Sequence, residues 1–164
     1  MKKHDSQRGW FAYELYQRMK DNDKIVVLTA DLGFGQFDAI KKDFPERFYN
    51  VGAAEQAMLG IAIGLALEGK IPFCYSITPF LLFRPFETIR NYIDHENIPV
   101  KLIGGGRYSD YKHDGFSHYA GDDKRFLRNF KNIVSYWPEH KEDIPNILSE
   151  VLSNNKPSYI NLTR

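Results

Sequence analysis

Residues 50–69 read NVGAAEQAMLGIAIGLALEG, and nearly every position in this stretch is small or apolar. Its small residues are Gly52, Ala53, Ala54, Ala57, Gly60, Ala62, Gly64 and Ala66. One acid, Glu55, lies inside the run. A glycine weakens a helix by roughly 1 kcal/mol relative to alanine, so glycines in a helical stretch indicate a packing reason. The stretch therefore predicts a closely packed helix over residues 54–68, with an ionisable carboxyl at its start.

The residues around Glu55 allow two interpretations of this acid. In the first, Glu55 complements the positive end of the helix dipole and stays partly exposed. In the second, the crowded small residues bury Glu55, and Gly52 lets the backbone approach a ligand or another chain. A carboxyl in such a site could exchange a proton with a ring nitrogen of a ligand. The residues alone leave both interpretations open.

The composition limits the classes of protein to consider. The chain has 164 residues, enough for one domain over residues 1–164, and 22 basic residues balance 21 acidic ones. A net charge of +1 gives no electrostatic reason to expect a nucleic-acid partner or an anionic membrane. The single cysteine, Cys74, excludes an internal disulfide framework and a cysteine-based zinc site. The polar start MKKHDSQRGW does not resemble a signal peptide, and residues 58–67 are too few to span a bilayer, so a cytoplasmic protein is expected.

Hydrophobic patterns along the chain alternate between helix and strand. Helices are predicted over residues 7–21, 36–43, 54–68, 80–95, 122–130 and 141–153, and Pro85 permits a kink or a late start in the fourth. Strands are predicted over residues 24–30, 47–51, 71–76, 99–106, 132–137 and 157–164. Such alternation predicts an α/β fold: a doubly wound, mostly parallel sheet with helices on both faces.

Chemically active residues follow several of these predicted strands. Asp31 comes after the first strand, Glu55 after the second, residues 75–83 after the third and residues 107–118 after the fourth. In open parallel sheets, ligands bind at the carboxyl ends of the strands. A ligand site is therefore expected at that edge of the sheet.

The segment RFYNVGAAEQAMLGIAIGLA, residues 47–66, resembles the cofactor-activating segment of the transketolase family, which includes the 1-deoxy-D-xylulose-5-phosphate synthases. The resemblance runs from about residue 8 to the C-terminus and corresponds to the pyrimidine-binding domain of those larger enzymes. It implies thiamine diphosphate as the cofactor, in the thiamine diphosphate-binding fold. It also implies that Glu55 hydrogen-bonds the pyrimidine N1′ and favours the imino tautomer that takes the thiazolium C2 proton.

The same resemblance assigns further residues to the cofactor. ADLG, residues 30–33, is similar to a family stretch that places Asp31 near the pyrimidine. CYSITPFLLFRPFETI, residues 74–89, is similar to the segment that supplies an aromatic ring to stack on the pyrimidine, and the candidates are Phe80, Phe83 and Tyr75. Arg84 matches an arginine in the synthase pattern, for which a structural role is expected. The plainer alternatives are a turn residue for Asp31 and core packing for each ring.

A second motif, GGGRYSDYKHDGFSH at residues 104–118, resembles the family's substrate loop. The resemblance implies that Asp114 and His118 face substrate hydroxyl and carbonyl oxygens and that Arg107 meets a substrate anion. Arg8 has the spacing of a phosphate-binding arginine, although a solvated charge explains it equally well. Gly35 stands where transketolases have a phosphate-binding serine, which puts the ordinary sugar-phosphate contact in doubt.

The chain contains no Gly-Asp-Gly motif of the kind that holds the diphosphate through Mg²⁺ in this family. The resemblance therefore implies a separate partner subunit that carries the Mg²⁺ and diphosphate domain, in an α2β2 heterotetramer. The helix over residues 54–68 is a plausible contact surface in that assembly. No metal ligand is expected in this chain.

The sequence leads to one functional hypothesis and two alternatives. The hypothesis is a pyrimidine-binding subunit of a split, thiamine diphosphate-dependent transferase that moves a two-carbon ketol or acyl unit between carbohydrate-like substrates. The first alternative is a structural or regulatory subunit that retains the fold without catalysis. The second is a subunit of a 2-oxo acid decarboxylase.

Overall fold

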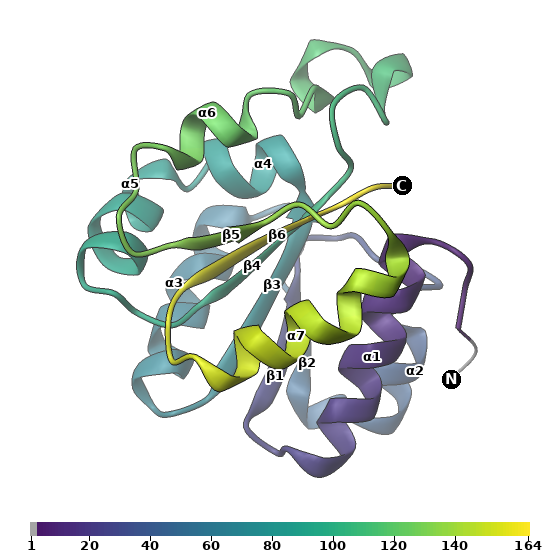
Figure 1. Ribbon diagram of the computed structural model, residues 1–164. Coiled ribbons are helices and arrows are strands. Elements are labelled where there is room, and N and C mark those ends of the chain that lie inside the picture. The colour runs from purple at the N-terminus through teal and green to yellow at the C-terminus, as the bar shows by residue number, and fades with distance from the viewer. Residues whose placement is uncertain (1–2) are drawn as a thin grey trace.

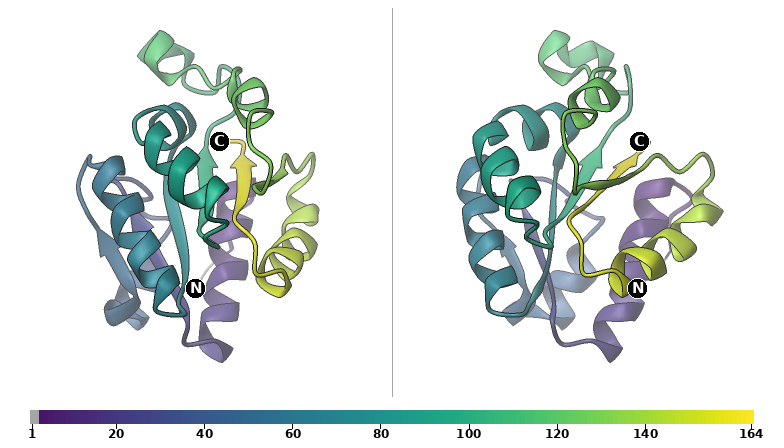
Figure 2. Two further views of the ribbon diagram at one scale, coloured as in Figure 1. Left: turned by 90° about the vertical axis from the view of Figure 1, so that its left-hand side faces the viewer. Right: turned by 60° about the vertical axis from the view of Figure 1, so that its left-hand side comes forward.

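The computed structural model describes residues 3–164, which form a six-stranded sheet between two layers of helices (Figures 1 and 2). The strands are β1 (Ile25–Thr29), β2 (Phe48–Asn50), β3 (Ile71–Ile77), β4 (Lys101–Gly105), β5 (Val134–Tyr136) and β6 (Ser158–Leu162). Their order across the sheet is β2-β1-β3-β4-β6-β5, and every pairing is parallel. The predicted α/β fold with a parallel sheet is confirmed.

Helices cover both faces of this sheet, as the doubly wound pattern predicted. One face is covered by α1 (Gln7–Asp21), α2 (Asp38–Asp43) and α7 (Ile144–Ser153). The other face is covered by α3 (Glu55–Leu67), α4 (Thr78–Phe83), the π-helix η2 (Ile89–His95) and α6 (Asp123–Leu127). The short helix α5 (Phe86–Thr88) connects α4 to η2. Each face thus has its own apolar core, and the central strands are buried on both sides.

The helical region predicted over residues 80–95 is interrupted at Pro85, where the sequence permitted a kink or a late start. The chain forms α4, breaks at Arg84 and Pro85, and continues as α5 and η2. Pro85 has no N–H to donate, and its ring crowds the preceding turn, so a helix tends to break there. Pro79 is tolerated because it lies in the first turn of α4. The break leaves Arg84 half exposed at the end of α4.

The order of the strands determines where a site can form. From β1 the chain moves to β2 on one side and then crosses to β3 on the other, so the winding reverses between β1 and β3. Such a reversal leaves a crevice beyond the carboxyl ends of the two strands. Helix α3 begins next to this crevice because it follows β2, and α4 begins directly after β3. The start of α3 and all of α4 therefore lie at the edge where the sequence predicted a ligand.

Candidate active site

Glu55 is the first residue of α3, and only 2% of its surface is exposed. The Ser76 hydroxyl donates a hydrogen bond to Glu55 Oε1 at 2.8 Å, and Arg84 Nη1 donates to Glu55 Oε2 at 2.7 Å. A buried carboxylate is tolerated only when it is paired and hydrogen-bonded, and these two donors meet that requirement. The interpretation of Glu55 as a partly exposed dipole acid is therefore wrong.

Arg84 makes a second contact beside the ion pair. Its guanidinium carbon lies 3.9 Å from the centroid of the Phe80 ring, so the planar cation covers a face of that ring. Phe80 belongs to α4 and is half buried, whereas 46% of the Arg84 side chain is exposed. Glu55, Arg84 and Phe80 thus form one continuous contact at the carboxyl edge.

The contact continues from Phe80 into the loop that follows β4. This loop folds into two short 3₁₀ turns, η3 (Lys112–Asp114) and η4 (Phe116–His118). The His118 ring lies edge-on to Phe80 with centroids 4.8 Å apart, and it also neighbours the Tyr111 ring at 6.1 Å. The Tyr111 hydroxyl accepts a hydrogen bond from Arg8 Nη1 at 3.0 Å. We call these residues together with Ser76 the edge cluster. Its members are Arg8, Glu55, Ser76, Phe80, Arg84, Tyr111 and His118.

Arg8 also borders a shallow hollow at the end of the edge cluster. The hollow is lined by His4, Ser6, Arg8, Gly9, Phe34, Gly35 and Gln36. Arg8 Nε is buried and has no hydrogen-bond partner among the described residues. Arg8 and Gly35 are thus neighbours in space.

Two predicted residues lie at the same edge but outside the edge cluster. Asp114 is exposed on η3, and its Oδ2 lies 3.3 Å from His113 Nε2. Asp31 is exposed with a left-handed backbone (φ 54°), and its side chain accepts a hydrogen bond from Asn50 Nδ2 at 3.3 Å. Among the described residues, neither acid bonds to a member of the edge cluster.

Of the three predicted aromatic residues, the structure places only Phe80 beside Arg84 and Glu55. Side chains alternate along a strand, so Tyr75 of β3 points to the face opposite Ser76. Tyr75 is 3% exposed and packs edge-on against Phe37, and burial raises its pKa to about 12. Phe83 is 43% exposed and packs edge-on against Phe126.

Arg107 is already engaged by the protein. Its Nε donates to Asn161 Oδ1 at 2.6 Å, its Nη2 to the Asn161 carbonyl at 2.7 Å and its Nη1 to the Pro138 carbonyl at 3.0 Å. Asn161 in turn donates to the Thr78 hydroxyl, which donates to the Gly106 carbonyl. In this structure Arg107 joins the ends of β4 and β6, and only its remaining N–H groups could meet a substrate anion.

Sequence reasoning missed two members of the edge cluster, Ser76 and Tyr111. Ser76 could have been found from strand alternation, because it has the opposite parity to Tyr75 within the predicted strand. Tyr111 had no comparable signal, because its contacts with His118 and Arg8 depend on how the loop folds. Ser76 is fully buried and holds one oxygen of Glu55.

Comparison with known proteins identifies the family. Residues 6–164 match the family described as "Transketolase, pyrimidine binding domain". The chain belongs to this family. This transketolase pyrimidine-binding domain is 34% identical, over 96% of its length and 50% of the relative, to a putative transketolase C-terminal section of Methanocaldococcus jannaschii. It is 35% identical, over 85% of its length and 45% of the relative, to one subunit of an apulose-4-phosphate transketolase of Actinobacillus succinogenes.

A solved structure gives the same result for the fold. A split-gene transketolase, described as an inactive beta4 tetramer, superposes on this pyrimidine-binding domain with a TM-score of 0.85 at 34% identity. The match covers 98% of this chain and 52% of the other. The chain thus spans about half the length of the curated relatives it matches. Among residues 3–164, the helices are too short or too polar for any of them to traverse a bilayer.

Proposed function

We propose that this chain supplies the pyrimidine half of a thiamine diphosphate site in a split, transketolase-like transferase. The observation that carries the proposal is that the buried Glu55 carboxylate and the Phe80 ring both contact one planar group, the guanidinium of Arg84. A carboxylate acceptor beside an aromatic face fits a flat heterocycle that carries N–H donors. The guanidinium of Arg84 shows that a planar donor fits between them.

Each residue of the proposed site has a task that matches its surroundings. Glu55 would hold N1′ of the pyrimidine, with Ser76 fixing the orientation of the carboxylate, and Phe80 would stack on the ring. When bound, the cofactor supplies the nucleophilic carbon for the transfer of a two-carbon unit. His118 and Asp114 would meet hydroxyl and carbonyl oxygens of a carbohydrate-like substrate, because an imidazole can exchange protons near neutral pH.

Two further residues of the same edge belong to the proposal. Asp31 and Arg8 lie at the same edge, where they could meet the cofactor and a substrate anion respectively. Phe83 and Tyr75 pack against the protein instead, so the proposal assigns the stacking role to Phe80.

The proposed enzyme needs a partner subunit that holds the diphosphate and Mg²⁺, in an α2β2 assembly. The relatives named as a transketolase subunit and as a split-gene transketolase support this expectation. One face of α3 also lacks a cover in this chain, because Ile61 and Leu67 are 46% and 70% exposed. A Cβ added at Gly60 or Gly64 would meet nothing within 4 Å. We assign this open face of α3 to contact between subunits.

Reconstitution tests the proposal. The chain is co-purified with a subunit that carries the diphosphate domain, and ketol transfer is measured with thiamine diphosphate and Mg²⁺. We expect activity only when both subunits and the cofactor are present. Glu55→Gln should lower kcat at least about 100-fold, because it removes the proton-transferring carboxyl. Glu68→Gln, at the exposed far end of α3, is the matched control and should retain activity.

Two results would reject the proposal. If the complex binds no thiamine diphosphate, the chain is not part of a thiamine site. If the complex forms but Glu55→Gln retains full activity, the chain is a non-catalytic subunit that kept the fold. Decarboxylation of a 2-oxo acid without transfer to a sugar acceptor would instead favour the decarboxylase alternative.

A further inference from the structure

Arg84 makes both of the contacts that the proposed function assigns to the cofactor's aminopyrimidine. It donates a hydrogen bond to Glu55 Oε2 at 2.7 Å, and its planar guanidinium lies 3.9 Å from the Phe80 ring centroid. An aminopyrimidine is also flat, its N1′ carries an N–H that can donate to Glu55 in the imino tautomer, and it would also lie between the carboxylate and the ring. The two planar groups therefore compete for one place.

We propose that Arg84 occupies the pyrimidine position in the free chain and swings away when thiamine diphosphate binds. The inference rests on the proposed function and adds a residue that regulates access to the site. Arg84 thereby acts as an internal substitute for the cofactor ring.

Several features allow Arg84 to leave. Its side chain is 46% exposed, and among the described residues its only hydrogen-bond acceptor is Glu55. It lies where α4 ends and Pro85 breaks the helical path, so its backbone is not held in the middle of a helix. Its long side chain can move by rotation about single bonds without disturbing the apolar core.

Other features explain why Arg84 is present in the free chain. Without it, the buried carboxylate of Glu55 would keep only the hydroxyl of Ser76, and an uncompensated buried charge is unfavourable. Arg84 therefore stabilises the empty site until a ligand donates to Glu55. The apparent affinity for the cofactor is the intrinsic affinity multiplied by the fraction of molecules in which Arg84 has already left.

The test compares Arg84→Met with Arg90→Met in the complex with the diphosphate-domain subunit. Methionine keeps an apolar stem but removes the guanidinium, and Arg90 is an exposed arginine of η2 that donates to the adjacent Asn91. Thiamine diphosphate affinity is measured by titration calorimetry at saturating Mg²⁺. We expect Arg84→Met to bind about tenfold more tightly than the wild type, because the internal competitor is gone. Arg90→Met should bind like the wild type.

A second readout uses the wild-type chain, so it does not depend on the folding of a variant. The side-chain ¹⁵N–¹H signals of Arg84 are followed by NMR with and without thiamine diphosphate in the complex. They should change on saturation from those of a paired guanidinium to those of a mobile one, while the Arg90 signals stay unchanged.

Equal or weaker cofactor binding by Arg84→Met, or an Arg84 signal that stays paired on saturation, would overturn the inference alone. In that case the wild type still binds the cofactor and the proposed function stands. If neither the wild type nor Arg84→Met binds the cofactor, the proposed function fails and the inference fails with it.

Discussion

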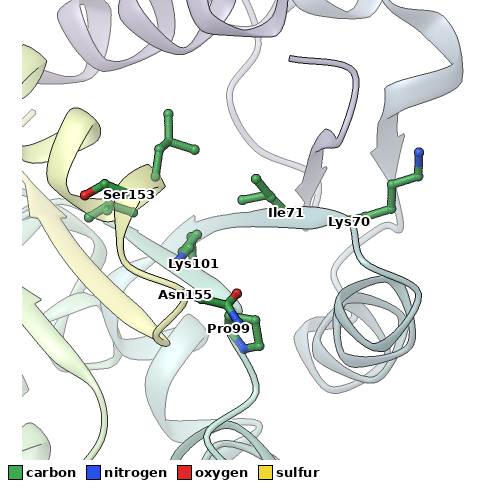
Figure 3. A pocket seen from close by; sticks show the side chains of 8 residues that line it. Lys70, Ile71, Pro99, Lys101, Ser153 and Asn155 are labelled. Carbon is green, nitrogen blue, oxygen red and sulfur yellow. The ribbon is translucent and has the colours of Figure 1, made fainter.

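Two charged side chains, Glu55 and Lys101, are each only 2% exposed, and they lie at opposite edges of the sheet. Glu55 lies at the carboxyl edge, and its charged partner Arg84 is a half-exposed side chain beside an aromatic ring. Lys101 begins β4 at the amino edge, and its Nζ donates to the backbone carbonyl of Lys156. Figure 3 shows the surroundings of Lys101, where the starts of β3 and β4 meet the end of α7.

The difference lies in whether the partner can be exchanged. A side chain such as Arg84 can rotate away and leave Glu55 to a ligand, whereas the Lys156 carbonyl is fixed just before β6. The residues around Lys101 include aliphatic and small polar side chains but no aromatic ring on which a ligand could stack. We infer that the buried charge of Glu55 at the carboxyl edge can exchange Arg84 for a ligand. The buried amine of Lys101 at the amino edge instead holds two neighbouring strands together.

The largest effect that separates the two edges is expected from His118→Asn. This change removes the titratable ring beside Phe80, and acid–base catalysis by one side chain contributes about 10²–10⁴-fold. In the reconstituted enzyme, kcat/KM for ketol transfer should fall about 100-fold, while the melting temperature stays close to that of the wild type.

Two variants control this prediction. His95→Asn changes a histidine of η2 whose side chain is 79% exposed, and it should leave kcat/KM unchanged. Lys101→Met at the amino edge should also keep kcat/KM, although its stability can differ. Loss of activity in Lys101→Met at unchanged melting temperature would contradict the separation of the two edges.

The next largest effect concerns the Glu55–Arg84 pair in the free chain. Breaking a fully buried pair is costly, and an exposed pair contributes little, so this half-exposed pair should fall between them at about 1–3 kcal/mol. Urea denaturation of Arg84→Met, Glu55→Gln and the double variant gives the coupling free energy.

The ion pair between Glu14 and Arg18 of α1 provides a second double-mutant cycle for comparison. Arg18 Nη1 and Glu14 Oε2 are 2.8 Å apart, and the two residues have i,i+4 spacing. Such pairs on a helix contribute about 0.3–0.5 kcal/mol. A Glu55–Arg84 coupling no larger than that of the α1 pair would show that Arg84 does little to stabilise the buried carboxylate.

The sequence predicted which helices and strands form better than it predicted their boundaries. All six strands were found because runs such as IVVLT are apolar and β-branched, but β2 is only three residues long at the edge of the sheet. Within the predicted helix over residues 80–95, Pro85 signalled a kink or a late start, but the apolar pattern does not show that the chain forms α4, α5 and η2 in turn. The limits of an element depend on tertiary contacts that no local pattern records.

The site was predictable where local sequence decided it. Glu55 stood out as the one acid in a run of small residues, and the family resemblance added the expectation that it holds the cofactor. Arg107 was expected to face a substrate, yet its acceptors come from Pro138 and Asn161, residues far along the chain. The pairing of Arg84 with Glu55 likewise joins α4 to α3, and no spacing in the sequence reveals it.

The smallest effect, taken per pH unit, is the pH dependence of stability due to Lys101, and it is the sharpest test of the amino edge. Burial lowers the pKa of Lys101 from 10.5 to about 8, because the interior disfavours the charged amine. Between these two pKa values the unfolded chain binds more protons at this residue than the folded chain, so the contribution of Lys101 to the free energy of unfolding rises with pH. The rise from one such group is at most about 1.4 kcal/mol per pH unit.

Denaturation between pH 8 and 10 measures this contribution, and Lys101→Met is the comparison. The window ends at pH 10 because burial raises the pKa of Tyr75 to about 12 and that of Tyr159 as well. A folded state that keeps its tyrosines protonated loses stability only above their ordinary pKa of about 10. Burial also raises the pKa of the Cys74 thiol, so this group lowers the stability of both proteins as the pH rises past its ordinary value. The free energy of unfolding of the wild type should therefore rise between pH 8 and 10 relative to that of Lys101→Met. Equal slopes for the two proteins would mean that Lys101 keeps its charge when folded, and the amino edge would then hold an ion much as the carboxyl edge does.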